Sequence, residues 1–314
     1  MNISICITTL NEEESIGRLL DSLLGQTKKP AEIVIVDGGS TDKTVEIINH
    51  YQKRFGKINL LKEKCSRAKG RNLGVEIAKG EIIAMTDAGC IARDNWLEEI
   101  TESFKHNEID VAAGFYHMTG SSPVSRAMQV FLGVTPSKFN INFLPSTRSI
   151  AFRKNIWEKV GGFPETQNGT AEDTVFNLKL VKSEAKIARV KNAVVEWGMP
   201  ETIKEFFYKI YEYARGDAKS KVWYFPGKGL TSHNIKVLYI ILRYLVAITL
   251  LFLSLKFAYL FPILVILFLL YLIWSFRKVY LEFGDYRIAI CGPILQISSD
   301  IAVMYGFIKG IIGK

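Results

Sequence analysis

Acidic side chains recur at the ends of short apolar runs in the first half of the chain. Asp37 ends one such run and precedes two glycines, Asp87 ends another, and Glu172 and Asp173 form a pair further on. Carboxylates in such positions can accept hydrogen bonds from a nucleotide, hold a hard divalent cation, or remove a proton from a hydroxyl group. Taken alone, Asp37 is more typical of a turn or a helix cap than of a ligand site.

The elements that must position these acids alternate between strands and helices. β-branched runs separated by single amphipathic helices predict a parallel, doubly wound sheet. Ligands bind such sheets at the carboxyl ends of the strands, where residues 8–12, residues 37–42 and Asp87 fall. The predicted strands cover residues 4–9, 32–36, 58–61 and 81–86, and the predicted helices cover 15–25, 68–78 and a segment that ends at residue 50.

The middle of the chain, from residue 111 to residue 195, is less regular. It contains a predicted strand at 149–152 and predicted helices at 154–160 and 171–182. Three cations surround that strand, and a solvated face is slightly favoured over an anion site for them; they are Arg148, Arg153 and Lys154.

A further helix is predicted at residues 201–216, with apolar side chains along one face. Trp223 and Phe225 follow it, as aromatic residues often do at a membrane interface. We interpret residues 201–235 as a collar at the membrane surface, although an ordinary core helix is the alternative.

Two long apolar segments predict membrane-spanning helices at residues 237–255 and 257–276. Each is about 20 residues long, which is the length needed to cross the hydrocarbon core of a bilayer. A third segment at 288–308 is a weaker candidate because it contains Asp300, and charge inside a membrane is costly. This segment either spans the membrane or lies at the interface.

The net charge of +9 is unevenly distributed, because residues 235–314 carry eight Lys and Arg against three Asp and Glu. The rest of the chain is close to balance, which excludes a nucleic-acid-binding protein with a concentrated basic surface. The four cysteines lack the spacing of a disulfide framework or a zinc site, and the first residues lack the pattern of a signal peptide. We expect a protein of the cell membrane whose part before the apolar segments lies in the cytoplasm.

Five short motifs occur in order along the first half of the chain: ICITTLNE at 5–12, IVIVDGGSTD at 33–42, RAKGRNLG at 67–74, AMTDAGC at 84–90 and the Glu172-Asp173 pair. In this order they resemble the inverting glycosyltransferases of family 2. The resemblance implies a GT-A fold, an α/β fold with a doubly wound mixed sheet, and it covers a glycosyltransferase domain at about residues 1–217. The apolar segments add C-terminal transmembrane helices in a region at 236–314, with an interfacial linker at 218–235 between the two.

The resemblance also implies a role for each matching residue. Asp37 would hold the base, and Asp87 stands where the family has its DxD motif, which holds the ribose and a divalent cation. Asp173 would be the catalytic base beside Glu172. The segment YARG is similar to a later motif of the family and would place Arg215 near the acceptor and the diphosphate. The implied nucleotide-sugar-binding residues are Thr8, Glu12, Asp37, Ser40, Arg71 and Asp87.

The turn after Asp87 departs from the family pattern, since Gly89 stands where many relatives have a second Asp. One metal ligand is thereby lost, and Cys90 does not replace it because a thiol is a poor ligand for Mg²⁺. Mg²⁺ needs few protein ligands when phosphate oxygens and water complete its shell. We therefore expect a Mg²⁺ or Mn²⁺ cofactor held by Asp87.

These features predict transfer of a sugar from a UDP- or GDP-sugar to a membrane-embedded acceptor, either a polyprenyl phosphate or a lipid-linked glycan. The departing diphosphate needs positive charge, and an acceptor hydroxyl needs a base. Two alternatives remain open. One is a sugar nucleotidyltransferase, which also needs a nucleotide pocket and a metal. The other is a membrane protein that binds a nucleotide-sugar without turning it over, because of Gly89.

Overall fold

The computed structural model describes residues 1–165, 171–226, 230 and 232–313. The chain forms two compact units, each with its own internal packing. The first unit consists of Met1–His117 and Lys138–Gly198, and the second consists of Met118–Ser137 and Met199–Lys314. The domain limits expected from the resemblance, at residues 217 and 235, remain a prediction.

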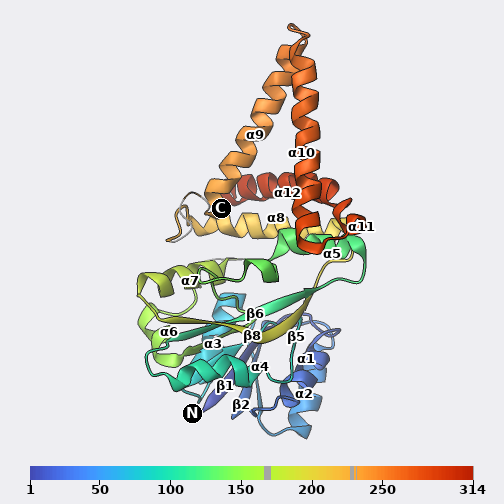
Figure 1. The fold of residues 1–314 in the computed structure, drawn as a ribbon. Coiled ribbons are helices and arrows are strands. Elements are labelled where there is room, and N and C mark those ends of the chain that lie inside the picture. Colours follow the sequence, from blue (N-terminus) through green and yellow to red (C-terminus); the bar gives the residue numbers. More distant parts are fainter. Residues whose placement is uncertain (166–170, 227–229, 231, 314) are drawn as a thin grey trace. The chain divides into compact units, whose positions relative to one another are not determined.

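The first unit is built around one eight-stranded mixed sheet (Figure 1) with the strand order β3-β2-β1-β4-β7-β6-β8-β5. The predicted α/β fold with a mixed sheet is therefore confirmed. The expectation of parallel pairing from the strand–helix alternation holds for β1 to β4, whereas β7 and β8 pair antiparallel with β4 and β5. The strands are β1 (Ile3–Thr9), β2 (Glu32–Asp37), β3 (Ile58–Lys62), β4 (Ile82–Met85), β5 (Cys90–Ala92), β6 (Val111–Thr119), β7 (Ile150–Arg153) and β8 (Ile187–Gly198).

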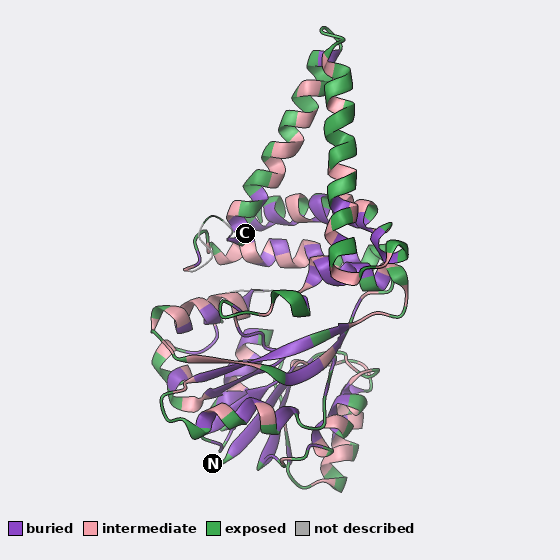
Figure 2. Cartoon of the chain, in the orientation of Figure 1, coloured by how far each residue is buried: buried purple, intermediate pink, exposed green. Residues whose placement is uncertain are grey.

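Helices connect these strands and cover both faces of the sheet. The strands form the most continuously buried part of the unit (Figure 2), and all six residues of β2 are buried. Phe163 and Phe176 belong to the same buried core as strand residues such as Phe152, and their rings stack with centroids 4.2 Å apart. The helices are α1 (Ile16–Leu24), α2 (Thr44–Arg54), α3 (Arg67–Ile77), α4 (Trp96–Glu102), α6 (Lys154–Val160) and α7 (Glu172–Lys182), with a short 3₁₀ helix η1 (Ser103–Lys105); a second 3₁₀ helix, η2 (Pro136–Lys138), lies at the boundary between the two units.

The parallel register brings three strand ends to one edge of the sheet. Thr9 at the end of β1 lies opposite Asp37 at the end of β2. On the other side of β1, Cys6 lies opposite Met85, so β4 ends three residues before the level of Thr9, and Asp87 follows two residues later. Because β1 lies between β2 and β4 and adjacent strands are about 4.8 Å apart, the ends of β2 and β4 are separated by about 10 Å across the sheet.

The second unit consists of helices. Three segments of the described part of this unit are long and apolar enough to cross a membrane: α9 and α10, with mean hydropathies of 2.3 and 2.2, and Tyr286–Ile312, with 1.5. Large apolar side chains such as Phe252 and Phe268 are more than half exposed on α9 and α10, as lipid-facing residues are. The described helices of this unit are α5 (Pro123–Leu132), α8 (Ile203–Ser220), α9 (His233–Ser254), α10 (Leu260–Phe283), α11 (Tyr286–Ala289) and α12 (Gly292–Ile312).

The third apolar segment forms α12, which lies alongside α8 and across the lower ends of α9 and α10 (Figure 1). Two glycines on one face of α12 allow this close contact. A Cβ at Gly306 would lie 2.4 Å from the carbonyl oxygen of Tyr211, and one at Gly310 would lie 2.5 Å from that of Arg215. Small residues spaced by four are the usual means by which two helix backbones approach closely.

Asp300 of α12 is 1% exposed and is fully engaged by neighbouring helices. Its carboxylate accepts hydrogen bonds from Arg243 and Tyr244 on α9, from Tyr271 on α10, at 2.7 Å, and from Gln296 on its own helix, at 2.9 Å. A buried carboxylate is tolerated only with such partners. Asp300 made this segment a weaker candidate for a membrane span. In the structure its carboxylate links α9, α10 and α12 through hydrogen bonds.

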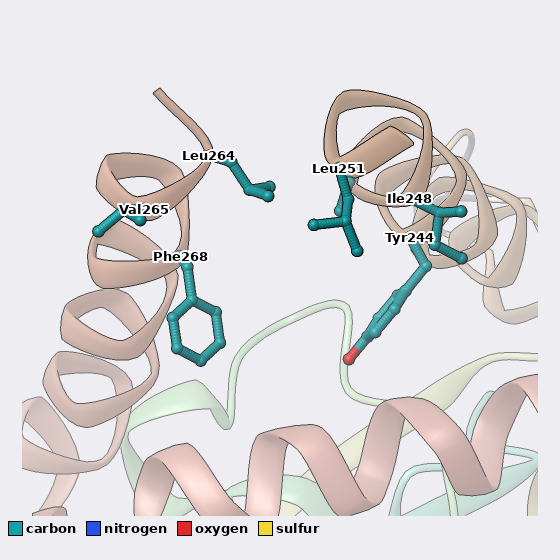
Figure 3. Close-up of a pocket in the computed structure, with 7 residues that line it drawn as sticks. Tyr244, Ile248, Leu251, Leu264, Val265 and Phe268 are labelled. Carbon is teal, nitrogen blue, oxygen red and sulfur yellow. The ribbon is translucent and has the colours of Figure 1, made fainter. Parts of the chain in front are cut away.

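A cleft of about 310 Å³ lies between α9 and α10. Figure 3 shows the two helices presenting side chains to each other across it. The lining is apolar except for the hydroxyl group of Tyr244. Its lining residues are Tyr244, Ala247, Ile248, Leu251, Leu264, Val265 and Phe268.

Candidate functional site

Arg71 of α3 is the centre of a polar cluster in the first unit. Its side chain is buried, and its Nη1 group donates to the carboxylate of Glu172, which is also buried. Its Nη2 group donates to Asp87 at 3.0 Å and to the hydroxyl of Thr147 at 2.9 Å. The structure thus brings Arg71, Asp87 and Glu172, three of the residues singled out from the sequence, into one network.

The motif RAKGRNLG places Arg71 by putting glycines on one face of α3 and arginines on another. A Cβ at Gly70 would lie 3.1 Å from Thr8, and one at Gly74 would lie 3.5 Å from Val36, so these glycines let the helix lie close to β1 and β2. Residues spaced by four share a helix face. Arg67 therefore follows Arg71 toward the same carboxylate of Glu172, with a nitrogen–oxygen distance of 3.6 Å.

Glu172 and Asp173 form the first turn of α7. The preceding residue, Ala171, has a φ of +82°, which only a well-supported backbone adopts in a residue with a side chain. Acidic residues at a helix start are favoured by the helix dipole. One oxygen of Glu172, Oε2, is buried without a hydrogen-bond partner among the described residues. A buried orphan acceptor of this kind is a position where a ligand or water can donate a hydrogen bond.

The environments of Asp173 and Asp87 move their pKa values in opposite directions. Burial, and then the neighbouring carboxylate of Glu172, raises the pKa of Asp173, although Arg71 and Arg148 oppose this. For Asp87 burial acts against ionisation, but Arg71 and then Arg148 hold its pKa below the ordinary value. Such a pair suits two roles. Asp87 can remain an anion, while Asp173 has the raised basicity that a proton acceptor needs.

Asp37 is engaged by its own loop. Its carboxylate accepts hydrogen bonds from the backbone N–H groups of Gly39 and Ser40, both at 3.0 Å, and from the Ser40 hydroxyl. Asn11 donates its backbone N–H to the same hydroxyl at 2.9 Å, which ties the loop to the end of β1. The turn-forming role that the sequence favoured for Asp37 alone is therefore present. A contact between Asp37 or Ser40 and a nucleotide remains a prediction.

Thr8 and Glu12 lie on the segment that follows from β1 into α1. Thr8 is half-buried against α3. Glu12 accepts a hydrogen bond from Ser15 and donates its backbone N–H to Thr44 at 2.7 Å. A Cβ at Gly89 would meet only the carboxylate of Glu12, at 4.0 Å. The first motif and the turn after Asp87 therefore face each other.

The cations around β7 do not form the solvated face that we expected. Arg153 donates to the carbonyl oxygens of Ile109, Phe104 and His106. Lys154 donates to the carbonyl oxygens of Glu76, in the last turn of α3, and of Ala78, which caps the end of that helix. That expectation is wrong because these cations satisfy helix and loop carbonyls that would otherwise lack donors.

Arg148 belongs to the site, which the sequence did not establish. Its guanidinium lies 3.8 Å from the ring centroid of Trp197 and 5.3 Å from that of Tyr116. Thr147, next to it in the chain, shares a donor group of Arg71 with Asp87. Another unforeseen residue, Asn72, braces the turn at Phe163 that leads toward α7. The RAKGRNLG motif contains Asn72 and could have indicated it. No local sequence pattern indicates that Arg148 lies beside Trp197.

The acids of the site offer few protein ligands to a divalent cation. No group of three or more His, Cys, Asp or Glu side chains suited to a metal occurs among residues 1–165, 171–226, 230 and 232–313. Asp87 is about one-third exposed and uses one oxygen on Arg71, and Gly89 adds no ligand. Mg²⁺ is commonly held by one carboxylate together with substrate phosphates. The donor set therefore fits a cation that arrives with a diphosphate.

Arg215 lies on α8 in the second unit, whereas the other candidate residues lie in the first. Its guanidinium pairs with Glu212, one turn earlier on the same helix, at 2.7 Å. Its assignment to the acceptor and diphosphate remains a prediction.

The mixed sheet with acids at its strand ends defines the first unit as a GT-A-like domain, the class of fold used by nucleotide-sugar transferases. The chain belongs to glycosyl transferase family 2, because the model of that family matches residues 4–163, about half of the chain. It is therefore a glycosyltransferase rather than the nucleotidyltransferase considered as an alternative.

Several known proteins are similar to this chain. The uncharacterized glycosyltransferase EpsJ of Bacillus subtilis is 24% identical over 73% of this chain and 71% of its own length. The chain spans less than two thirds of the length of other curated relatives, including the Streptococcus pneumoniae glycosyltransferase GlyG and the Haloferax volcanii glycosyltransferase AglE.

Two solved structures share the fold. The Pyrobaculum calidifontis mannosyltransferase PcManGT, in complex with GDP-Man and Mn²⁺, is 18% identical and aligns over 97% of this chain and 87% of its own, with a TM-score of 0.61. Staphylococcus aureus TarS in complex with UDP is 23% identical over 69% of this chain and 65% of its own, with a TM-score of 0.52.

Proposed function

We propose that this protein transfers a sugar from a UDP- or GDP-sugar to a lipid-linked acceptor at the membrane, with inversion of the anomeric centre. The observation that carries the proposal is the convergence of Asp87 and the Glu172-Asp173 pair on Arg71 at the carboxyl end of a family 2 sheet. Asp37, Ser40, Thr8 and Glu12 would line the nucleotide part of this edge.

The proposed chemistry assigns one task to each acid. Asp173 accepts the proton of the acceptor hydroxyl, for which its raised pKa suits it. Asp87 stays ionised and would hold a Mg²⁺ or Mn²⁺ ion, which supplies positive charge to the diphosphate when bound. Glu172 fixes Arg71, and Arg71 in turn fixes Asp87. Attack by the acceptor from the face opposite the diphosphate inverts the anomeric carbon.

The second unit supports a membrane-embedded acceptor. Helices α9 and α10 expose apolar side chains over most of their length, and an apolar cleft lies between them. We infer that these two helices span the cell membrane. We infer that α12 lies at the interface, because it packs along α8, which carries charged residues throughout. The catalytic unit would then face the cytoplasm, where nucleotide-sugars are made.

A donor and acceptor screen tests the proposal. The intact protein in detergent or nanodiscs is supplied with UDP- and GDP-sugars, with and without Mn²⁺, and with polyprenyl phosphate or a lipid-linked glycan. We expect release of nucleoside diphosphate that requires one lipid acceptor, and a product of opposite anomeric configuration to the donor. Binding of donor without its consumption across the panel would instead indicate the non-catalytic alternative.

The variant Asp173→Asn separates the two acceptor classes. The second pKa of a phosphate monoester is about 6, so a polyprenyl phosphate is largely a dianion at neutral pH and needs little help from a base. A sugar hydroxyl does need a base, so the rate of transfer to a hydroxyl acceptor should fall by about 10²- to 10⁴-fold in this variant. Asp94→Asn, at an exposed aspartate of the same unit, is the control. Unchanged rates with both acceptors would show that Asp173 is not the base.

A further inference from the structure

Arg148 is held close to the acidic cluster by two independent connections. The first runs through its neighbour Thr147, whose hydroxyl accepts a hydrogen bond from the same nitrogen of Arg71 that binds Asp87. The second runs through Trp197 of β8, which lies opposite Cys90 of β5 in the sheet. The backbone N–H of Cys90 donates to the carbonyl of Asp87 at 3.0 Å, so Trp197 adjoins the turn that contains Asp87.

An aromatic ring and a hydrogen bond restrain the Arg148 guanidinium. Its Cζ lies over the Trp197 ring, 3.8 Å from the centroid, its Nη1 donates to the Ser146 hydroxyl at 3.0 Å, and Tyr116 meets Trp197 edge to face with centroids 5.8 Å apart. A guanidinium presents its N–H donors in its own plane, in a geometry that matches two oxygens of a phosphate. Stacking restricts the rotation of the side chain before any ligand binds, so less conformational entropy is lost on binding.

The other cations near Asp87 are paired with acids of the cluster. Arg71 pairs with Asp87 and Glu172, and Arg67 lies 3.6 Å from Glu172. A nucleoside diphosphate adds negative charge to a cluster that already contains three acids. Gly89 supplies no second carboxylate to hold a metal ion there. The positive charge of Arg148 acts on both carboxylates of this region. It contributes to the lowered pKa of Asp87, and it offsets part of the increase in the pKa of Asp173.

We propose that Arg148, stacked on Trp197, binds the diphosphate of the nucleotide-sugar. Its charge replaces part of the positive charge that a divalent cation would supply if an acidic residue at position 89 helped to hold it. The inference rests on the proposed function. As the glycosidic carbon–oxygen bond breaks, its electron pair passes to the departing phosphate oxygen, and Arg148 stabilises this charge. The acceptor oxygen forms the new bond, and its proton passes to Asp173.

The test compares the binding of nucleoside diphosphates with that of nucleosides. Calorimetry on the intact protein in detergent measures the affinities for UDP, uridine, GDP and guanosine, each with EDTA or with Mn²⁺. Arg148→Gln removes the positive charge. Arg148→Lys keeps the charge but lacks the planar guanidinium that stacks on Trp197. Arg54→Gln is the matched control, because Arg54 also lies over an aromatic ring, that of Phe55, but is exposed on α2.

We expect Arg148→Gln to weaken diphosphate binding by about 10- to 100-fold, since hydrogen bonds to charged groups contribute about 1.5–3 kcal/mol. Nucleoside binding should be unchanged, which also shows that the variant is folded. The loss should be larger in EDTA than in Mn²⁺, because the metal supplies part of the same charge. Arg148→Lys should fall between wild type and Arg148→Gln, and Arg54→Gln should resemble wild type.

Two outcomes overturn the inference while leaving the proposed function intact. If Arg148→Gln binds UDP and GDP as wild type does, Arg148 does not contact the diphosphate. If it weakens diphosphate and nucleoside equally, Arg148 only supports the shape of the pocket. If wild type binds neither diphosphate, the proposed function itself fails, and the role of Arg148 fails with it.

Discussion

Removal of Arg71 should destabilise the first unit strongly, because it leaves the buried carboxylate of Glu172 without its hydrogen-bond donor and Asp87 without its ion-pair partner. In Arg71→Met, Glu172 remains 3% exposed and loses its donor, while its other oxygen already has no partner among the described residues. Breaking a buried ion pair from one side costs about 3–5 kcal/mol. For a domain of this size each kcal/mol lowers the melting temperature by about 2–4 °C, which gives a loss of about 6–20 °C.

Two further variants show whether the cost comes from the buried charge. Glu172→Gln keeps an acceptor for Arg71 and should cost less, about 1–3 kcal/mol. The double variant Arg71→Met/Glu172→Leu replaces the pair by apolar groups and should recover most of the stability lost by Arg71→Met. Melting of the intact protein in detergent, followed by circular dichroism, measures all three, with the exposed Arg54→Met as control. A loss under about 3 °C for Arg71→Met, or additive losses in the double variant, would refute this reasoning.

Three further predictions follow from individual contacts. Because the pKa of Asp173 is raised, transfer to a hydroxyl acceptor should fall on acidification at a higher pH than an ordinary aspartate would give, which a pH–rate profile tests. Gly89→Asp has room for its side chain and should make nucleoside diphosphate binding weaker in EDTA but stronger in Mn²⁺, by calorimetry. Alanine normally stabilises a helix over glycine by about 1 kcal/mol, yet Gly306→Ala and Gly310→Ala should lower the melting temperature by several degrees, unlike Ile311→Ala on the exposed side of α12.

Local sequence patterns were sufficient for the elements that carry the nucleotide-binding edge. β-branched runs give β1 and β2, and the helix predicted at 154–160 is α6 with the same bounds. Because parallel strands end at one edge, the pattern also indicated that Asp37 and Asp87 would lie near each other. Such predictions succeed because strand and helix periodicity are properties of a few consecutive residues.

Contacts between distant segments could not be predicted in this way. The antiparallel strands β5 and β8 pair across a long stretch of chain, and only this pairing brings Trp197 beside the Asp87 turn. Likewise Asp300 weakened the prediction of a third span, because its partners on α9 and α10 follow only from the packing of three helices. Burial and charge pairing depend on tertiary structure, so the stacking of Arg148 on Trp197 follows only from the three-dimensional fold.

Neutralising Asp173 and neutralising Glu172, the two neighbouring acids of α7, should change the melting temperature in opposite directions. The pKa of Asp173 is raised by burial and by Glu172, so the fold disfavours its ionised form. This cost is absent below the pKa of an unfolded aspartate, grows as pH rises toward the raised pKa, and is constant above it. Asp173→Asn keeps an acceptor for the Thr174 N–H and should therefore raise the melting temperature at neutral pH and leave it unchanged in acid. Glu172→Gln, which weakens the pair with Arg71, should lower it. A lower melting temperature for Asp173→Asn at neutral pH would mean that Arg71 and Arg148 outweigh burial, and that Asp173 is an ordinary ion-paired carboxylate rather than a base with raised pKa.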